Sequence, residues 1–289
     1  MESRPFRAIL NFAHRCAMSC EWCYVPFGSH IARKDQVASI VDRIAELGFT
    51  SITFGGGDPF QYRFIPDLLL RAKALKLFVH VDTHGKSLRE NLQNFQLIES
   101  HIDLLGLPVD GSGSEWHDVM RSASGHFEII SQRLNWLKPL RSRLKLNTVI
   151  SSVNVSDLPA LSNLIASYGP SRWSVYQYWP LGPGAKVVDK HSISDIEFLR
   201  SAEQVRNVFS QSTTIVEINS RESRRDTYPI IHHDGEVFVH AGAPHNNFVP
   251  IGSIFDPGIM PNILAHCSPE RQSAASRYDK VPLVDIGRS

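Results

Sequence analysis

The stretch Cys16-Ala-Met-Ser-Cys20-Glu-Trp-Cys23-Tyr24 places three cysteines at the spacing C-x3-C-x2-C, just after the apolar run 8–12. Thiolates this close in sequence can reach one small inorganic centre from a single loop. Three ligands leave one iron of a [4Fe-4S] cluster without a protein thiolate, and that iron can bind a small molecule. A zinc site completed by His14 is the alternative. The spacing and the aromatic residue that follows favour the cluster.

Composition limits the class of protein. The 289 residues are 42% hydrophobic, which suffices for a large core, and the formal net charge is +1. This charge balance does not favour nucleic-acid or anionic-membrane partners. The charged N-terminus is unlike a signal peptide, and no apolar stretch approaches about 18 residues. Four cysteines, three of them clustered, do not resemble a disulfide framework, so we expect a cytoplasmic protein.

Strand-like and helix-like segments alternate along the first 180 residues, which is typical of βα units around a parallel sheet. Glycine-rich and polar residues follow the strands, and in parallel barrels active sites form at that end. The expected strands are 8–12, 51–54, 77–82, 102–107, 144–150 and 173–178, with a further strand at 214–218. The expected helices between them are 35–47, 64–75, 88–99, 127–137 and 158–168.

The region after residue 180 has a different pattern. We expect a loop at 181–185, a helix within 193–210, a β-hairpin over 228–240 with an Asp-Gly turn, a loop at 241–250 and a short helix at 259–266. We interpret 1–180 as a core barrel and 181–289 as its completion and C-terminal lid, within one domain. The predicted fold is α/β, a partial (β/α)6 TIM-like barrel with a C-terminal extension.

The cysteine loop resembles the signature of the radical S-adenosylmethionine (SAM) enzymes. In that family three cysteines hold a [4Fe-4S] cluster whose open iron chelates SAM, and an electron from the cluster cleaves SAM to methionine and a 5′-deoxyadenosyl radical. The resemblance implies that Cys16, Cys20 and Cys23 are the metal ligands. It also implies an electron donor such as flavodoxin or ferredoxin.

Further motifs agree with this resemblance and imply a SAM site. Gly56-Gly57-Asp58-Pro59 is similar to the family's Gly-Gly-Glu-Pro motif, which holds the amino group of SAM, with aspartate in place of glutamate. Glycines also allow close approach of the backbone to a ligand. The remaining cofactor-binding candidates are Tyr24, Thr83, His84, Asp110 and Arg121. The guanidinium of Arg121 suits the SAM carboxylate. His84 as a loop histidine and Arg121 as a surface arginine are the alternatives.

The substrate candidates lie on two later strands. Lys145 and Asn147 are two residues apart and therefore share a strand face, and a lysine inside a barrel requires an anionic partner. With Arg172 they resemble the nucleotide pocket of viperin, a radical SAM enzyme that dehydrates a nucleoside triphosphate. Ser174 stands where viperin has a second lysine, and residues 25–30 contain none. We add Tyr176 as a fourth candidate. The alternative for Lys145 is a side chain that extends to solvent.

Three hypotheses follow for function. The first is a viperin-like enzyme that takes hydrogen from a small anionic substrate, possibly a nucleotide. The second is a peptide- or natural-product-modifying radical SAM enzyme without auxiliary clusters, since Cys267 alone cannot hold a second cluster. The third is a non-catalytic iron–sulfur or zinc protein. Four histidines within 232–245 follow no standard metal-ligand spacing.

Overall fold

The computed structural model describes residues 7–26, 31–240 and 247–267. The strands are β1 (Arg7–Ala13), β2 (Ser51–Gly56), β3 (Phe78–Asp82), β4 (Leu104–Pro108), β5 (Leu144–Ile150), β6 (Arg172–Gln177), β7 (Ile215–Asn219), β8 (Ile230–His232), β9 (Glu236–His240) and β10 (Phe248–Ser253). The helices are α1 (Lys34–Glu46), α2 (Ile65–Ala74), α3 (Leu92–His101), α4 (Ser114–Arg121), α5 (His126–Trp136), α6 (Leu158–Tyr168), α7 (Val188–His191), α8 (Asp195–Val208), α9 (Arg221–Arg224) and α10 (Ile259–His266).

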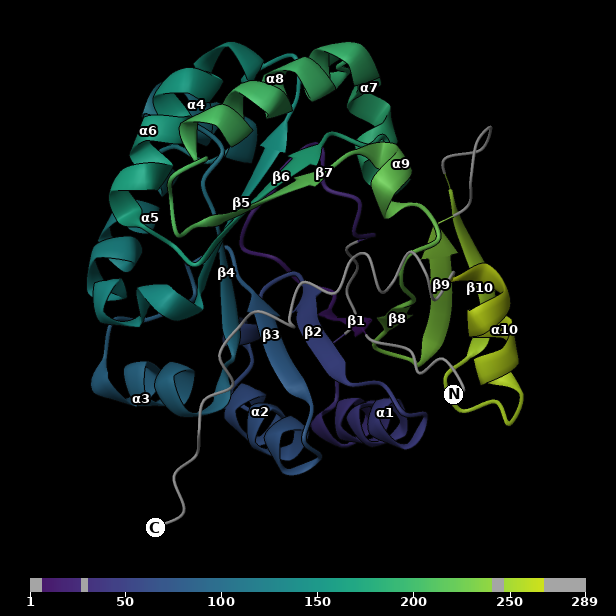
Figure 1. Ribbon diagram of the computed structural model, residues 1–289. Coiled ribbons are helices and arrows are strands. Elements are labelled where there is room, and N and C mark those ends of the chain that lie inside the picture. The colour runs from purple at the N-terminus through teal and green to yellow at the C-terminus, as the bar shows by residue number, and fades with distance from the viewer. Residues whose placement is uncertain (1–6, 27–30, 241–246, 268–289) are drawn as a thin grey trace.

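One curved sheet carries all ten strands, in the order β10-β9-β8-β1-β2-β3-β4-β5-β6-β7. The strands from β1 to β7 pair in parallel, and β8 adds to β1, also in parallel. The hairpin strands β9 and β10 continue that edge antiparallel. Figure 1 shows the sheet bent into an arc with the long helices on its outer side. The predicted partial (β/α) barrel is confirmed.

The helices form where apolar residues recur at helical spacing. In α1 the buried side chains are Val37, Ile40, Val41 and Ile44, which form one stripe against the sheet. Helix α6 begins with proline in its first turn and ends at Gly169, whose φ of 59° suits a helix terminus. These outer helices pack against the sheet and hold its strands in place. The residues of the site follow the C-terminal ends of the strands.

Three segments differ from the expectation. Residues 248–253 form β10 rather than a loop, because they pair with β9; residues 241–246 lie outside the described ranges. The loop expected at 181–185 is part of a 3-10 helix, Gly182–Val187, that leads into α7. Helix α4 was not predicted. No helix in the described ranges is both long and apolar enough to cross a membrane.

Candidate active site

A cavity of about 280 Å³ lies at the C-terminal ends of the parallel strands. Its lining combines the cysteine loop, the glycines after β2, the loop after β3, Arg121 of α4 and the ends of β5 and β6. The lining residues proposed from sequence are Cys16, Cys20, Cys23, Tyr24, Gly56, Gly57, Thr83, His84, Arg121, Asn147 and Tyr176. The structure therefore brings residues from each of the sequence motifs to one cavity.

The three cysteines of the loop after β1 line the cavity together as free thiols. The backbone N–H of Cys23 donates to the carbonyl of Cys20 (3.1 Å), which folds the loop back on itself. Desolvation raises the pKa of Cys16 to about 11 and that of Cys23 to about 12, so thiolates here need a cationic partner. Across the residues described, no group of three or more His, Cys, Asp or Glu side chains is placed to hold a single metal ion. Cys16, Cys20 and Cys23 are the residues that would hold a [4Fe-4S] cluster at this loop.

The glycine motif packs directly on the cysteine loop. The backbone N–H of Gly57 donates to the carbonyl of Ala13. A Cβ atom at Gly57 would lie 1.8 Å from the carbonyl oxygen of Arg15, and one at Gly56 would lie 2.5 Å from that of Ala13. Gly56 also has a φ of 105°, which side chains rarely adopt. These glycines therefore hold the backbone of the cysteine loop at its distance from β2.

Asp58 is fully buried and does not line the cavity. Its carboxylate accepts hydrogen bonds from the Thr83 hydroxyl (2.7 Å), the His84 N–H (3.2 Å) and the Phe60 N–H (2.8 Å). Burial raises the pKa of Asp58 to about 6. The structure thus places Asp58 behind Thr83 and His84, where it fixes the loop after β3 against the glycine motif.

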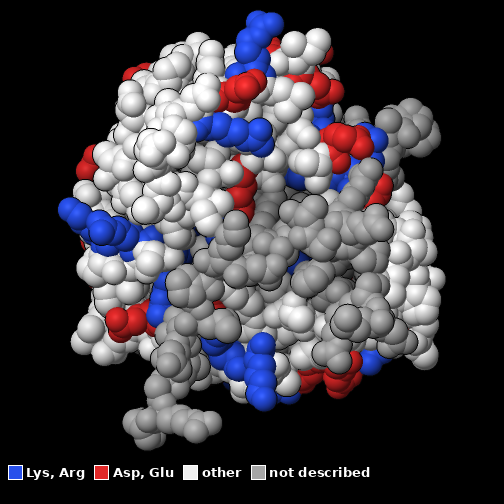
Figure 2. All heavy atoms as spheres, viewed as in Figure 1, with Lys and Arg blue, Asp and Glu red and all other residues white. Residues whose placement is uncertain are grey.

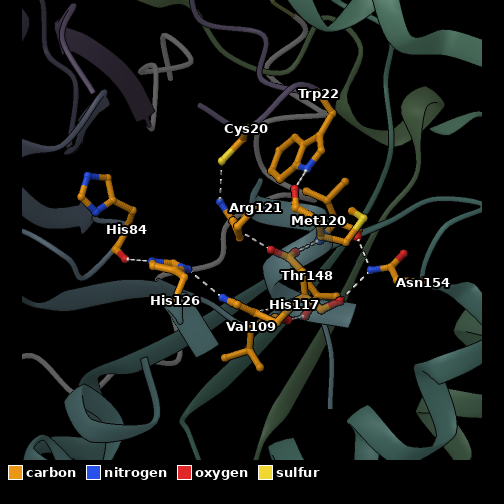
Figure 3. Close-up of polar contacts among 12 residues, drawn as sticks. Cys20, Trp22, His84, Val109, His117, Met120, Arg121, His126, Thr148 and Asn154 are labelled. Atoms are coloured by element: carbon orange, nitrogen blue, oxygen red, sulfur yellow. Dashed lines mark hydrogen bonds and ion pairs between the residues drawn. The ribbon is translucent and has the colours of Figure 1, made fainter. Parts of the chain in front are cut away.

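Arg121 lies between the cysteine loop and the carboxylate of Asp110. Figure 3 shows its guanidinium directed toward the sulfur of Cys20. Its Nε atom donates to the buried carboxylate of Asp110, and its Nη1 atom lies 4.0 Å from the sulfur of Cys20. The guanidinium also lies 4.9 Å from the ring centroid of Trp22. Asp110 is fully buried, accepts a hydrogen bond from the Val149 N–H (2.7 Å), and does not line the cavity.

A chain of histidines links the two walls that carry Arg121 and His84 (Figure 3). The backbone N–H of Asp110 donates to Nδ1 of His117 (3.0 Å), so the proton of His117 is on Nε2. That Nε2 donates to Nδ1 of His126 (2.8 Å), and Nε2 of His126 donates to the carbonyl of His84 (2.8 Å). Burial lowers the pKa of His117 to about 2 and that of His126 to about 4, which keeps both rings neutral. No role was predicted for either histidine, although His117 precedes Arg121 by one helical turn on α4.

The two cations proposed for the substrate are buried beside the cavity and do not line it. The ammonium of Lys145 donates to the hydroxyl of Tyr176 (3.0 Å). The guanidinium of Arg172 pairs with Glu217 of β7 (2.9 Å), whose other oxygen accepts from the Ser174 hydroxyl. Lys145 is buried and faces the barrel interior, one of the two directions that strand alternation allows, and it lies close enough to Asp82 to help lower that carboxyl's pKa.

The C-terminal part of the chain supplies a wall that the sequence analysis did not find. Arg224 of α9 lies over the rings of Tyr176 and Trp179, with its carbon Cζ 5.6 and 5.0 Å from their centroids. The ring of His240 stacks on Trp179 at 4.8 Å. All four residues line the cavity. The hairpin was predicted. The parallel pairing of β8 with β1 brings His240 to the cavity, and no local sequence pattern predicts that pairing.

Comparison with known proteins defines the class. The model of the Radical SAM superfamily matches residues 10–165, more than half of the chain, so the chain belongs to this superfamily. Members of the superfamily carry a [4Fe-4S] cluster and bind SAM. The three thiols, the glycine motif and Arg121 around one cavity fit both groups.

Two relatives within this class carry the same name. The chain is 27% identical over 256 residues to an S-adenosylmethionine-dependent nucleotide dehydratase of Lacinutrix mariniflava, covering 82% of this chain and 51% of that protein. It is 27% identical over 239 residues to a dehydratase of the same name from Flammeovirga pacifica, covering 77% of this chain and 78% of that protein. The chain therefore spans between half and four fifths of these relatives.

A solved structure with the same fold is Streptococcus suis SuiB bound to S-adenosylmethionine. The TM-score is 0.71 at 14% identity, with 95% of this chain and 68% of that chain covered. At this identity the likeness concerns the fold, and it agrees with the barrel and extension seen here.

Proposed function

We propose that this chain is a viperin-like radical SAM enzyme that acts on a small anionic substrate of the nucleotide class. When bound, the cluster and SAM supply a 5′-deoxyadenosyl radical that abstracts hydrogen. The observation that supports the proposal is the gathering of three thiols, the glycine motif and Arg121 around one cavity.

The residues of this chain divide the task. Cys16, Cys20 and Cys23 hold the cluster. The backbone at Gly56 and Gly57 and the side chains of the residues that follow β3 bind SAM, and the guanidinium of Arg121 receives its carboxylate. Asp58 and Asp110 position these groups from behind.

The substrate occupies the part of the cavity that Asn147, Tyr176 and Arg224 line. Arg224 supplies positive charge there, next to two aromatic rings. Lys145 and Arg172 do not contact the substrate, because their charged groups are bound to Tyr176 and Glu217. Their role is to hold these two side chains in place.

The test is anaerobic reconstitution with iron, sulfide, SAM and dithionite, with 5′-deoxyadenosine as the product measured. We expect wild-type protein to form it, with stimulation by a nucleotide among mono-, di- and triphosphates. Flavodoxin or ferredoxin should replace dithionite as the electron donor. Cys20→Ala should abolish the product. Cys267→Ala is the matched control, because Cys267 is a buried thiol away from the cavity.

Two results would contradict the proposal. The absence of 5′-deoxyadenosine under every condition, together with zinc as the only bound metal, would support a non-catalytic protein. Product formation without stimulation by any nucleotide would favour a peptide or natural-product substrate.

A further inference from the structure

Two polar side chains meet across an intervening strand in the wall of the cavity. Asp82 ends β3, Asn147 is on β5, and Gly106 lies between them on β4. A Cβ atom at Gly106 would lie 1.9 Å from Oδ1 of Asp82 and 2.8 Å from Nδ2 of Asn147. Only glycine at this position lets Asn147 Nδ2 donate to Asp82 Oδ1, at 2.8 Å. The pair is therefore built by three strands together.

This pair leaves two hydrogen-bond acceptors without a full set of partners. Nδ2 of Asn147 is engaged by Asp82, and its Oδ1 is a buried oxygen that has no hydrogen-bond partner within residues 7–26, 31–240 and 247–267. Both side chains line the cavity, and 40% of the side-chain surface of Asp82 is exposed there. Oδ1 of Asp82 also lies 3.2 Å from Nε2 of His80, so its other oxygen is the one left to a ligand.

Asp82 is ionised throughout the physiological pH range. Burial alone would raise its pKa, but the neighbouring His80 and Lys145 and the hydrogen bond from Asn147 outweigh that effect and hold it well below the usual range. An anionic carboxylate beside an unpaired amide oxygen repels phosphate. The same two acceptors suit O–H groups, since an unsatisfied buried acceptor gains a bond that it otherwise lacks.

We propose that Asp82 and Asn147 form a diol-binding pair that receives adjacent sugar hydroxyls of the substrate, a role that rests on the function proposed above. A carboxylate that accepts ribose hydroxyls is an established solution for nucleotides. The anionic part of the substrate then lies away from this wall, toward Arg224 of α9. The sequence predicted Asn147 as a substrate contact, but nothing in the local sequence linked it to Asp82.

Direct binding to the reconstituted enzyme in the presence of SAM tests the pair. The probes are ribose 5-phosphate and the four ribonucleoside 5′-monophosphates, with their 2′-deoxy and 3′-deoxy counterparts, measured by equilibrium dialysis. We expect the best ribonucleotide to bind about tenfold more tightly than its deoxy counterparts, the loss of one charged hydrogen bond. Asp82→Asn should reduce this preference to about threefold or less and leave SAM binding unchanged.

The controls separate this inference from the proposed function. Asp67→Asn removes a carboxylate of a surface ion pair with Lys34 and should leave every affinity unchanged. Equal wild-type affinity for ribo and deoxy probes, or no binding of any of them, would overturn the diol-binding pair. A loss of SAM affinity in Asp82→Asn without a change for nucleotides would also overturn it. In each case 5′-deoxyadenosine formation by the wild type reports separately on the proposed function.

Discussion

Replacing Gly57 by alanine tests how closely the glycine motif controls the cysteine loop. The new Cβ would lie 1.8 Å from the carbonyl oxygen of Arg15 and 2.6 Å from its carbonyl carbon. Such contacts do not occur below 3.0 Å, so the backbone has to move by about 1.2 Å. Gly57 has no left-handed φ, so the effect is steric. A displacement near 1 Å at a reacting centre costs about 100-fold in rate, and overpacking costs about 1–3 kcal/mol of stability.

Iron content, 5′-deoxyadenosine rate and urea unfolding measure the three effects. We expect Gly57→Ala to lose most of its iron and about 100-fold in rate. At Gly55 the corresponding atom would lie 3.4 Å from Oδ1 of Asn11, an ordinary contact, so Gly55→Ala should be mild. Gly258→Ala is the control, with a φ of −100° and nothing within 4 Å. Wild-type iron content and rate in Gly57→Ala would refute the reasoning.

Three further outcomes are expected. His126→Phe should weaken SAM binding about tenfold, because it removes both hydrogen bonds of the His126 ring. His126→Gln should retain part of the affinity. Equal Kd values for SAM in both variants and the wild type would exclude a positioning role for His126. Glu217→Gln should cost about 3 kcal/mol in urea unfolding, since Arg172 keeps a buried charge without its ion partner, and a loss below about 1 kcal/mol would contradict this. Burial lowers the pKa of His80 to about 4 and that of His117 to about 2, so these histidines bind protons at a higher pH in the unfolded chain than in the folded one. Their contribution to stability is complete above pH 6.5 and should be lost steadily as the pH drops toward 4. A urea midpoint that stays constant over this range would contradict the prediction.

Local pattern predicted most of the barrel. The bounds of β5 and α6 match the expected ranges 144–150 and 158–168, because apolar spacing and a helix-stopping glycine are local signals. The parallel attachment of β8 to β1 was not predicted. It depends on packing between segments more than 200 residues apart, for which this single sequence offers no pattern.

The candidate site, like the barrel, was predicted where the signal is local in the sequence. Cysteine spacing and the glycine motif identified one wall. Strand alternation placed Lys145 and Asn147 on one face of β5, and the fold decides that this face is the inner one. Alternation could not show which group would accompany Lys145. The ionised neighbour turned out to be Asp82 on β3, within the same chain.

The surface charge adds one observation. Figure 2 shows lysine and arginine side chains interspersed with aspartate and glutamate on the visible face. On this face the two signs alternate rather than gather into one field.

The attachment of β8 to β1 has a consequence for biosynthesis. Ile9 pairs with Ile230, so the sheet cannot be completed until the ribosome has released that late segment. Pairing over such a distance raises the contact order and slows folding. Until then the cysteine loop lacks the neighbour that packs on His14, whose ring lies 4.1 Å from that of His233. We therefore expect a nascent chain arrested before residue 228 to retain less iron than the full chain after reconstitution with iron and sulfide.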